Sequence, residues 1–239
     1  MIPGRQVERD GIERELSLNV GAMVLEGTLG LPKNPRGLVL FAHGSGSSRR
    51  SPRNRYVAGV LQSRGIATLL FDLLTREEDA VDQRTAELRF NIGLLAERLS
   101  SATQSIMCNP DVEGLSVGYF GASTGASAAL AAAAELPGVI SAIVSRGGRP
   151  DLAGDSLLSV RVPTLLIVGG EDEPVISLNR EALAKLHSSE KKLVIIPGAT
   201  HLFEEPGALE EVARLAAGWF TQHLACPERV HAQASVRSE

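Results

Sequence analysis

Two stretches near the start of the chain alternate between apolar and polar residues. Residues 12–20 and 23–31 each carry an apolar side chain at about every second position, and Gly21-Ala22 separates them. Such alternation is typical of strands with one buried face, and a short glycine-containing connection favours a hairpin. We therefore predict an antiparallel hairpin over residues 12–31, followed by a turn at residues 33–37.

Further along, apolar runs without alternation indicate strands that are covered on both faces. These runs alternate with helix-like stretches, and Ser51-Pro52 offers an N-cap followed by a proline at the first helical position. The predicted strands are residues 38–42, 66–71, 115–120, 139–144, 164–168 and 193–196. The predicted helices are residues 51–64, 126–135, 176–187 and 205–224, together with a long amphipathic stretch at 81–107.

The alternation of strands and helices predicts an α/β fold with a mostly parallel, doubly wound sheet of about eight strands. The length of 239 residues fits one domain, which we place at residues 1–227, with a polar tail at residues 228–239. Residues 146–162 leave room for one short helix and no large cap domain. Ligands of such sheets bind beyond the carboxyl ends of the strands, so the loops that follow strands are the places to search.

Composition narrows the class of function. The formal net charge is −4, so the chain lacks the basic excess that is typical of nucleic-acid binders. Two cysteines are too few for a disulfide framework, and no segment resembles a signal peptide or a membrane span. We therefore expect a cytoplasmic enzyme acting on a small molecule, without a nucleic-acid or membrane partner. The oligomeric state stays open between a monomer and a homodimer.

Residues 121–125 read Gly-Ala-Ser-Thr-Gly and lie between a predicted buried strand and an alanine-rich helix. They match the G-x-S-x-G pattern, in which a sharp strand-to-helix turn exposes a nucleophilic serine, here Ser123. A serine on so sharp a turn needs small neighbours two residues away, and Gly121 and Gly125 supply them. The same pattern is also typical of a turn that lets a helix pack closely on a sheet.

A serine hydroxyl needs a positioned base, which a carboxylate must orient. His201 follows the last predicted strand, and Asp172 follows the strand before it. Glu171 and Glu173 flank Asp172, but acidic loop residues are normally solvated. We prefer Asp172 because it stands in the Gly-Gly-x-Asp-x-x-Val pattern that is usual for this role. The sequence thus predicts a catalytic triad of Ser123, Asp172 and His201.

The charge that develops on an ester oxygen needs two backbone N–H donors, the oxyanion hole. We expect one from Thr124, the residue after the nucleophile. The other is expected from Ser45 in the loop 43–48, whose glycines let the backbone turn an N–H inward. The structural alternative for this loop is a flexible Gly/Ser turn.

Arginines gather in loops that we expect to surround the site. Their guanidinium groups suit carboxylate or phosphate, and we name His43, Arg146 and Arg149 as candidates for substrate contact. The alternative, which we favour for most of the arginines, is pairing with nearby carboxylates. The arginines are Arg49, Arg50, Arg53, Arg55, Arg146 and Arg149, and the carboxylates are Asp72, Glu77, Glu78, Asp79, Asp151 and Asp155.

The motifs at residues 43–46, 121–125 and 198–201 resemble those of the α/β-hydrolase superfamily, specifically its dienelactone-hydrolase-like branch, over most of the chain. The chain order serine, aspartate, histidine fits this resemblance. Residues 145–150 and 201–204 are also similar to hydrolase domains that occur fused to phosphoribosyltransferases. The short lead before the first strand leads us to expect no such partner domain here. Dienelactone hydrolase itself uses a cysteine, so Ser123 implies serine-type ester hydrolysis and puts the dienelactone substrate in doubt.

We therefore expect a carboxylesterase-type serine hydrolase that cleaves small or short-acyl esters through an acyl-enzyme. An acyltransferase or a peptidase could use the same triad, and a non-catalytic protein could bind a small anion through the arginines. We expect no cofactor and no metal, because the five histidines show neither HExxH nor clustered spacing.

Overall fold

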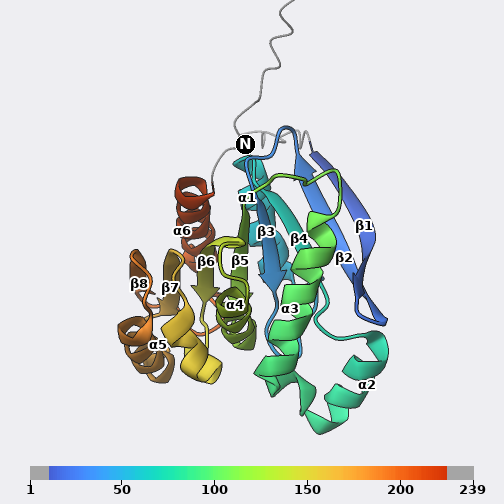
Figure 1. Ribbon diagram of the computed structural model, residues 1–239. Coiled ribbons are helices and arrows are strands. Elements are labelled where there is room, and N and C mark those ends of the chain that lie inside the picture. The colour runs from blue at the N-terminus through green and yellow to red at the C-terminus, as the bar shows by residue number, and fades with distance from the viewer. Residues whose placement is uncertain (1–10, 225–239) are drawn as a thin grey trace, which may run out of the picture.

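The computed structural model describes residues 11–224, so the predicted tail at 228–239 lies outside the described residues. One eight-stranded sheet organises them, with the strand order β1-β2-β4-β3-β5-β6-β7-β8 (Figure 1). The strands are β1 (Gly11–Val20), β2 (Met23–Pro32), β3 (Leu38–Ala42), β4 (Ala67–Phe71), β5 (Val117–Ala122), β6 (Ile140–Arg146), β7 (Thr164–Gly169) and β8 (Lys191–Ile196). The α-helices are α1 (Pro52–Ser63), α2 (Arg76–Thr85), α3 (Ile92–Met107), α4 (Thr124–Glu135), α5 (Glu173–Lys185) and α6 (Ala208–His223).

The pairing of the strands confirms the predicted α/β fold class. β1 and β2 form the antiparallel hairpin, and β2 also pairs antiparallel with β4. The other neighbouring strands are parallel, so the carboxyl ends of β3 to β8 lie along one edge of the sheet. The loops that carry the predicted site residues all leave the sheet at this edge.

Helices cover both faces of the sheet, as Figure 1 shows. One apolar cluster joins α1 and α6 to the sheet, and a second joins α3, α4 and α5 to its other face. β3 and β5 are buried along their whole length, as the unbroken apolar runs predict. Ser51 accepts a hydrogen bond from the Asn54 amide, which confirms the predicted N-cap of α1.

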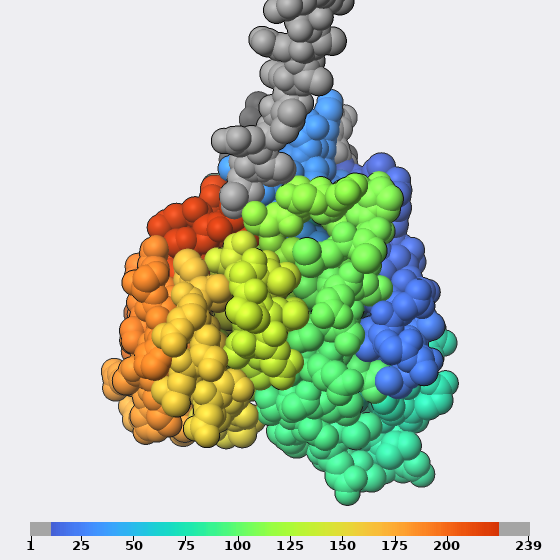
Figure 2. All heavy atoms as spheres, in the orientation of Figure 1, coloured from blue at the N-terminus to red at the C-terminus, as the bar shows by residue number. Residues whose placement is uncertain are grey.

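The predicted amphipathic stretch at 81–107 is not one helix. It contains the end of α2, a 3₁₀ turn η1 (Leu88–Phe90) and α3. Ala86 adopts a left-handed conformation with φ 56°, which ends α2. The buried carboxylate of Asp82 accepts hydrogen bonds from the amides of Leu88 and Arg89, so the chain turns back on itself. α2 and η1 project at the lower right in Figure 2.

Between β6 and β7 the chain forms only the short 3₁₀ segment η2 (Pro150–Ser159), kinked at Gly154. No large cap domain stands there, as predicted. None of the helices within residues 11–224 has both the length and the apolar character needed to cross a membrane.

Candidate active site

Ser123 stands on a strained turn between β5 and α4. Its backbone has φ 51° and ψ −121°, a conformation that side chains other than glycine rarely adopt. Such a conformation costs on the order of 1–3 kcal/mol and persists only where its surroundings impose it. A Cβ at Gly121 would lie 2.4 Å from the Ala126 Cα, and one at Gly125 would lie 2.1 Å from the Ala42 carbonyl oxygen. The turn therefore needs both glycines, as the sequence predicts.

The end of β6 and the loop after it bind both backbone groups of Ser123. The Ser123 amide donates to the Arg146 carbonyl over 3.2 Å, and the Arg149 amide donates to the Ser123 carbonyl over 3.2 Å. Asn179, which is fully buried on α5, donates its side-chain N–H to the Gly148 carbonyl over 3.0 Å. Asn179 thus connects the helix that follows Asp172 to the loop that fixes Ser123. The sequence offers no signal for this contact.

His201 and Asp172 meet at the ends of β8 and β7. The distance between His201 Nδ1 and Asp172 Oδ2 is 2.6 Å. Since an ionised carboxylate only accepts, we assign the proton to Nδ1, which leaves Nε2 free to accept one. The Asp172 side chain is 14% exposed and the His201 side chain 38% exposed, so the imidazole faces solvent while its carboxylate partner is shielded.

Among residues 11–224 no hydrogen bond joins His201 to Ser123, although the structure brings their loops to the same edge of the sheet. Such contacts often tighten only when substrate binds. Gly147 lies close to the histidine, because a Cβ there would be 3.6 Å from His201 Cε1. The turn that holds Ser123 therefore also packs against the imidazole.

The two predicted oxyanion donors are neighbours, but one of them is engaged. The Ser45 amide donates to the Thr124 hydroxyl over 2.9 Å. The Thr124 amide opens α4, where the first N–H groups have no partner within the helix. An oxyanion could bind the Thr124 amide directly. To bind the Ser45 amide as well, it would have to displace the Thr124 hydroxyl, which accepts the hydrogen bond from that amide.

A small cavity of about 110 Å³ adjoins these two residues. Its wall includes Ser45, Thr124, Leu73, Leu74 and Leu95. A larger cavity of about 300 Å³ lies between the hairpin and α1. None of the three predicted triad residues lines either cavity, but only the small one is lined by both predicted oxyanion donors.

His43 has no ring nitrogen available for a substrate. Its Nδ1 lies 3.0 Å from the Gly44 carbonyl oxygen, and its Nε2 accepts from the Leu73 amide over 3.1 Å. Backbone groups thus occupy both ring nitrogens, so the predicted substrate contact of His43 reduces to packing in the wall of the small cavity, which it lines. Burial lowers the pKa of His43, against smaller opposing contributions from Gly44 and Asp72. The neutral ring instead ties the loop after β3 to the loop after β4.

This lowered pKa makes stability depend on pH. Below about pH 6.5 the unfolded chain takes up a proton that native His43 resists. The stabilising contribution is thus complete above that pH and is lost as the pH falls. His43→Gln keeps an acceptor for the Leu73 amide but cannot titrate, so we expect it to cost about 1 kcal/mol at neutral pH. Between pH 7 and pH 5 it should lose less stability than the parent, as measured by urea denaturation. Parallel losses for both proteins would contradict this role of His43.

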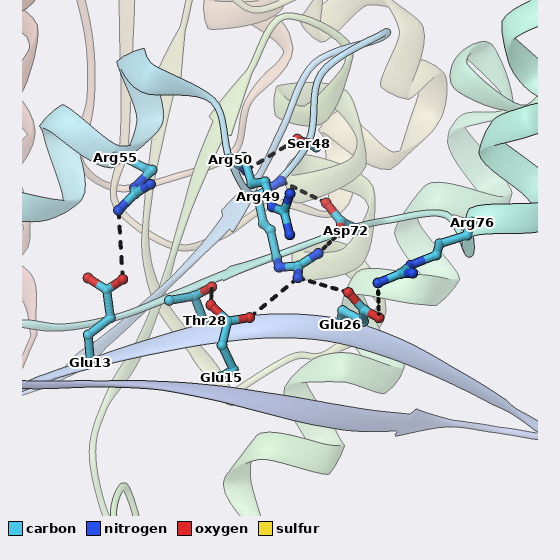
Figure 3. Close-up of polar contacts among 10 residues, drawn as sticks. All are labelled: Glu13, Glu15, Glu26, Thr28, Ser48, Arg49, Arg50, Arg55, Asp72 and Arg76. Atoms are coloured by element: carbon cyan, nitrogen blue, oxygen red, sulfur yellow. Dashed lines mark hydrogen bonds and ion pairs between the residues drawn. The ribbon is translucent and has the colours of Figure 1, made fainter.

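Four of the six loop arginines contact carboxylates, but only Arg49 with Asp72 and Arg149 with Asp151 do so with a predicted partner. Figure 3 shows the Arg49 guanidinium among Glu15, Glu26 and Asp72. The distance to Glu26 is 2.8 Å, and the Arg49 amide donates to Asp72 over 2.7 Å. Burial opposes the charge, but the contact with Asp72 and the other carboxylates still raises the pKa of Arg49. Arg49 therefore fastens the end of the oxyanion loop to the hairpin and to β4.

Arg149 and Arg146 differ sharply. Arg149 forms a two-point contact with Asp151, at 2.9 and 2.8 Å, so its predicted substrate contact is not supported. Arg146 is only 7% exposed, and no hydrogen bond or ion pair to its guanidinium occurs within the part of the chain that the structure describes. Burial, with the like charge of Arg53, lowers the pKa of Arg146 to about 10.

Comparison with solved structures supports an α/β-hydrolase fold. A dienelactone hydrolase from Anabaena variabilis is 60% identical, with a TM-score of 0.88, and the match covers 90% of this chain and 99% of that chain. Est1E from Butyrivibrio proteoclasticus is 17% identical, with a TM-score of 0.73 and coverage of 87% and 98%, and shares the fold.

A curated relative from Mycobacterium tuberculosis, named a putative phosphoribosyl transferase, is 56% identical over 215 residues. The match covers 90% of this chain and 47% of the relative, so the chain spans about half the length of the curated relatives it matches. The model of the dienelactone hydrolase family matches residues 25–224, nearly all of the residues that build the sheet and the site. On this match and the shared fold, the chain belongs to the dienelactone hydrolase family.

Proposed function

We propose that this protein is a serine hydrolase that cleaves small or short-acyl carboxylic esters. The observation that carries the proposal is the 2.6 Å contact between His201 and Asp172 at the same sheet edge as the strained Ser123. A carboxylate-oriented imidazole at the same sheet edge as a half-buried serine is the arrangement from which nucleophilic catalysis can proceed. The family membership and the 60% identical dienelactone hydrolase support a hydrolase.

In the proposed reaction, His201 Nε2 takes the Ser123 proton as the serine oxygen attacks the ester carbonyl. The carbonyl oxygen becomes negative and is bound by the amides of Thr124 and Ser45. His201 then gives its proton to the departing alkoxide, which leaves an acyl-enzyme on Ser123. Water, deprotonated by His201, releases the carboxylic acid and restores the serine. Asp172 stays ionised throughout and stabilises the imidazolium.

The small cavity supports a limit on the acyl chain. A volume of about 110 Å³ holds a group of a few heavy atoms, since one water in the liquid takes about 30 Å³. The segment of α2 and η1 closes its other side, with Arg76, Asp79 and Arg89 in the wall. We therefore expect acetyl to butyryl esters to be preferred over octanoyl esters by about tenfold in kcat/KM, since a chain longer than the cavity must displace its packed walls, at a cost of about 1–3 kcal/mol.

A fluorophosphonate probe tests the nucleophile, and a series of p-nitrophenyl esters tests the chain-length limit. We expect one labelled residue, Ser123, located by peptide mass spectrometry, and turnover that falls with chain length. A folded protein without labelling would favour the alternative of a non-catalytic anion-binding protein. Added alcohols, amines and peptides, scored by product analysis, separate an esterase from an acyltransferase or a peptidase.

A further inference from the structure

Within residues 11–224, Arg146 is a buried cation without a counterion. Its Nε atom is fully shielded from solvent and has no hydrogen-bond partner among these residues. Its terminal nitrogens have no partner within residues 11–224 either, yet they are not among the fully shielded atoms. A buried charge is costly unless it is paired, so a protein keeps one at a strand end only where something offsets that cost.

The surroundings of Arg146 offset the charge only in part. Its guanidinium carbon lies 5.9 Å from the centroid of the Phe203 ring, a favourable cation–π contact. The charged group that acts on it is Arg53 on α1, which repels it. Arg53 donates to Glu204 over 2.9 Å, but its own Nε is also buried without a partner. Two neighbouring guanidinium groups with unused donors form a place that suits an anion.

The position of Arg146 indicates which part of a substrate would meet it. Its carbonyl holds the Ser123 amide, and Phe203 follows His201 by two residues. The proposed reaction requires the leaving alcohol to lie beside His201, which protonates it. The small cavity at Ser45 and Thr124 is lined by neither Arg146 nor Phe203, so it suits the acyl group.

We propose that Arg146 and Arg53 form an anion subsite for a carboxylate or phosphate group on the alcohol part of the ester. This inference rests on the proposed ester hydrolysis, because that reaction defines the alcohol side. The terminal nitrogens of Arg146 bind two oxygens of the anion, and Arg53 adds a second positive charge. The Phe203 ring packs against the Arg146 guanidinium.

A matched pair of acetate esters tests the subsite. 4-Acetoxybenzoate carries a carboxylate on the leaving group, and 4-acetoxybenzamide carries a neutral amide at the same place. The measured quantity is the ratio of their kcat/KM values, anionic over neutral. Arg146→Met is expected to lower this ratio about 10- to 100-fold, the value of a hydrogen bond to a charged group. Arg146→Lys keeps the positive charge but loses the planar guanidinium that can bind an anion at two points, so it should give an intermediate ratio. This second variant keeps the test usable if Arg146→Met folds poorly.

Arg161→Met is the matched control, because this exposed arginine precedes β7 at the opposite edge of the sheet. It removes the same charge and should leave the ratio as in the parent. Mono-4-nitrophenyl succinate, with its carboxylate on the acyl side, should respond less to Arg146→Lys than 4-acetoxybenzoate does. Equal ratios in the parent and both Arg146 variants would overturn the subsite.

Inorganic phosphate provides a measurement that does not depend on ester hydrolysis. At constant ionic strength it should raise the melting temperature of the parent and of Ser123→Ala, but not that of Arg146→Lys, since a ligand stabilises the state that binds it. A melting temperature that does not respond in the parent counts against the subsite. Hydrolysis that is equal in the parent and in Ser123→Ala would instead overturn the proposed function. The phosphate measurement would then still report whether Arg146 binds an anion.

Discussion

Replacing Ser123 by alanine is expected to lower kcat/KM for p-nitrophenyl acetate by at least about 10³-fold. The loss is large because the hydroxyl supplies the bond that forms the acyl-enzyme, and no neighbouring group can take its place. His201 and Asp172 would keep their contact but would have no nucleophile to activate. The measurement is steady-state hydrolysis with active protein quantified by fluorophosphonate labelling of the parent.

Two further serine variants serve as controls for the loss of activity in Ser123→Ala. Ser63→Ala removes a hydroxyl on the exposed side of α1 and should leave turnover as in the parent. Ser123→Gly should be as inactive as Ser123→Ala but more stable than the parent by about 1 kcal/mol, because glycine tolerates the φ of 51°. Retained hydrolysis in Ser123→Ala, with an intact far-UV spectrum, would refute the assignment of the nucleophile.

Gly125→Ala is expected to cost at least about 3 kcal/mol of stability, or to prevent folding. In a free helix the change would be favourable by about 1 kcal/mol, because alanine is the better helix former. Here the new Cβ would lie 2.1 Å from the Ala42 carbonyl oxygen and 2.5 Å from that of His43. Both obstacles are backbone atoms at the end of β3, so a side-chain rotation cannot relieve the clash. The overlap therefore outweighs the helix propensity.

Gly218→Ala is the matched control for this clash. Gly218 lies within α6, and a Cβ there would meet nothing within 4 Å. This variant should gain about 0.5–1 kcal/mol, as measured by urea denaturation under the same conditions. A Gly125→Ala protein with nearly the stability of the parent would show that the turn at Ser123 can widen, which would contradict the close packing of α4 on β3.

Most of the sheet could be predicted because its signals are local. Alternation identifies the hairpin, unbroken apolar runs identify the covered strands, and Ser51-Pro52 marks the start of α1. The meeting of His201 with Asp172 could also be anticipated, since residues that follow parallel strands gather at one edge. The need for glycine at positions 121 and 125 could be predicted as well, because so sharp a turn leaves no room for a side chain there.

The remainder depends on contacts between distant residues, which a linear pattern does not contain. The stretch 81–107 keeps a helical period, yet Asp82 reverses the chain by binding two amides further along. The sequence suggested that His43 could contact a substrate, but its Nε2 accepts a hydrogen bond from the Leu73 amide, 30 residues further along. Arg149, in the loop after β6, pairs with Asp151 two residues away, whereas Arg146, the last residue of β6, has no carboxylate partner within residues 11–224. Two arginines three positions apart therefore differ in pairing because of where the fold places them.

The brevity of η2 has a consequence for the lifetime of the acyl-enzyme. Since η2, of ten residues, is the one helical segment between β6 and β7, and since the His201 imidazole is 38% exposed, we expect bulk water to reach the proposed acyl group readily. Deacylation should then be rapid, and acylation should limit the overall rate. In that regime a pre-steady-state burst of alcohol is absent, and competing acceptors capture little of the intermediate because water reaches it first.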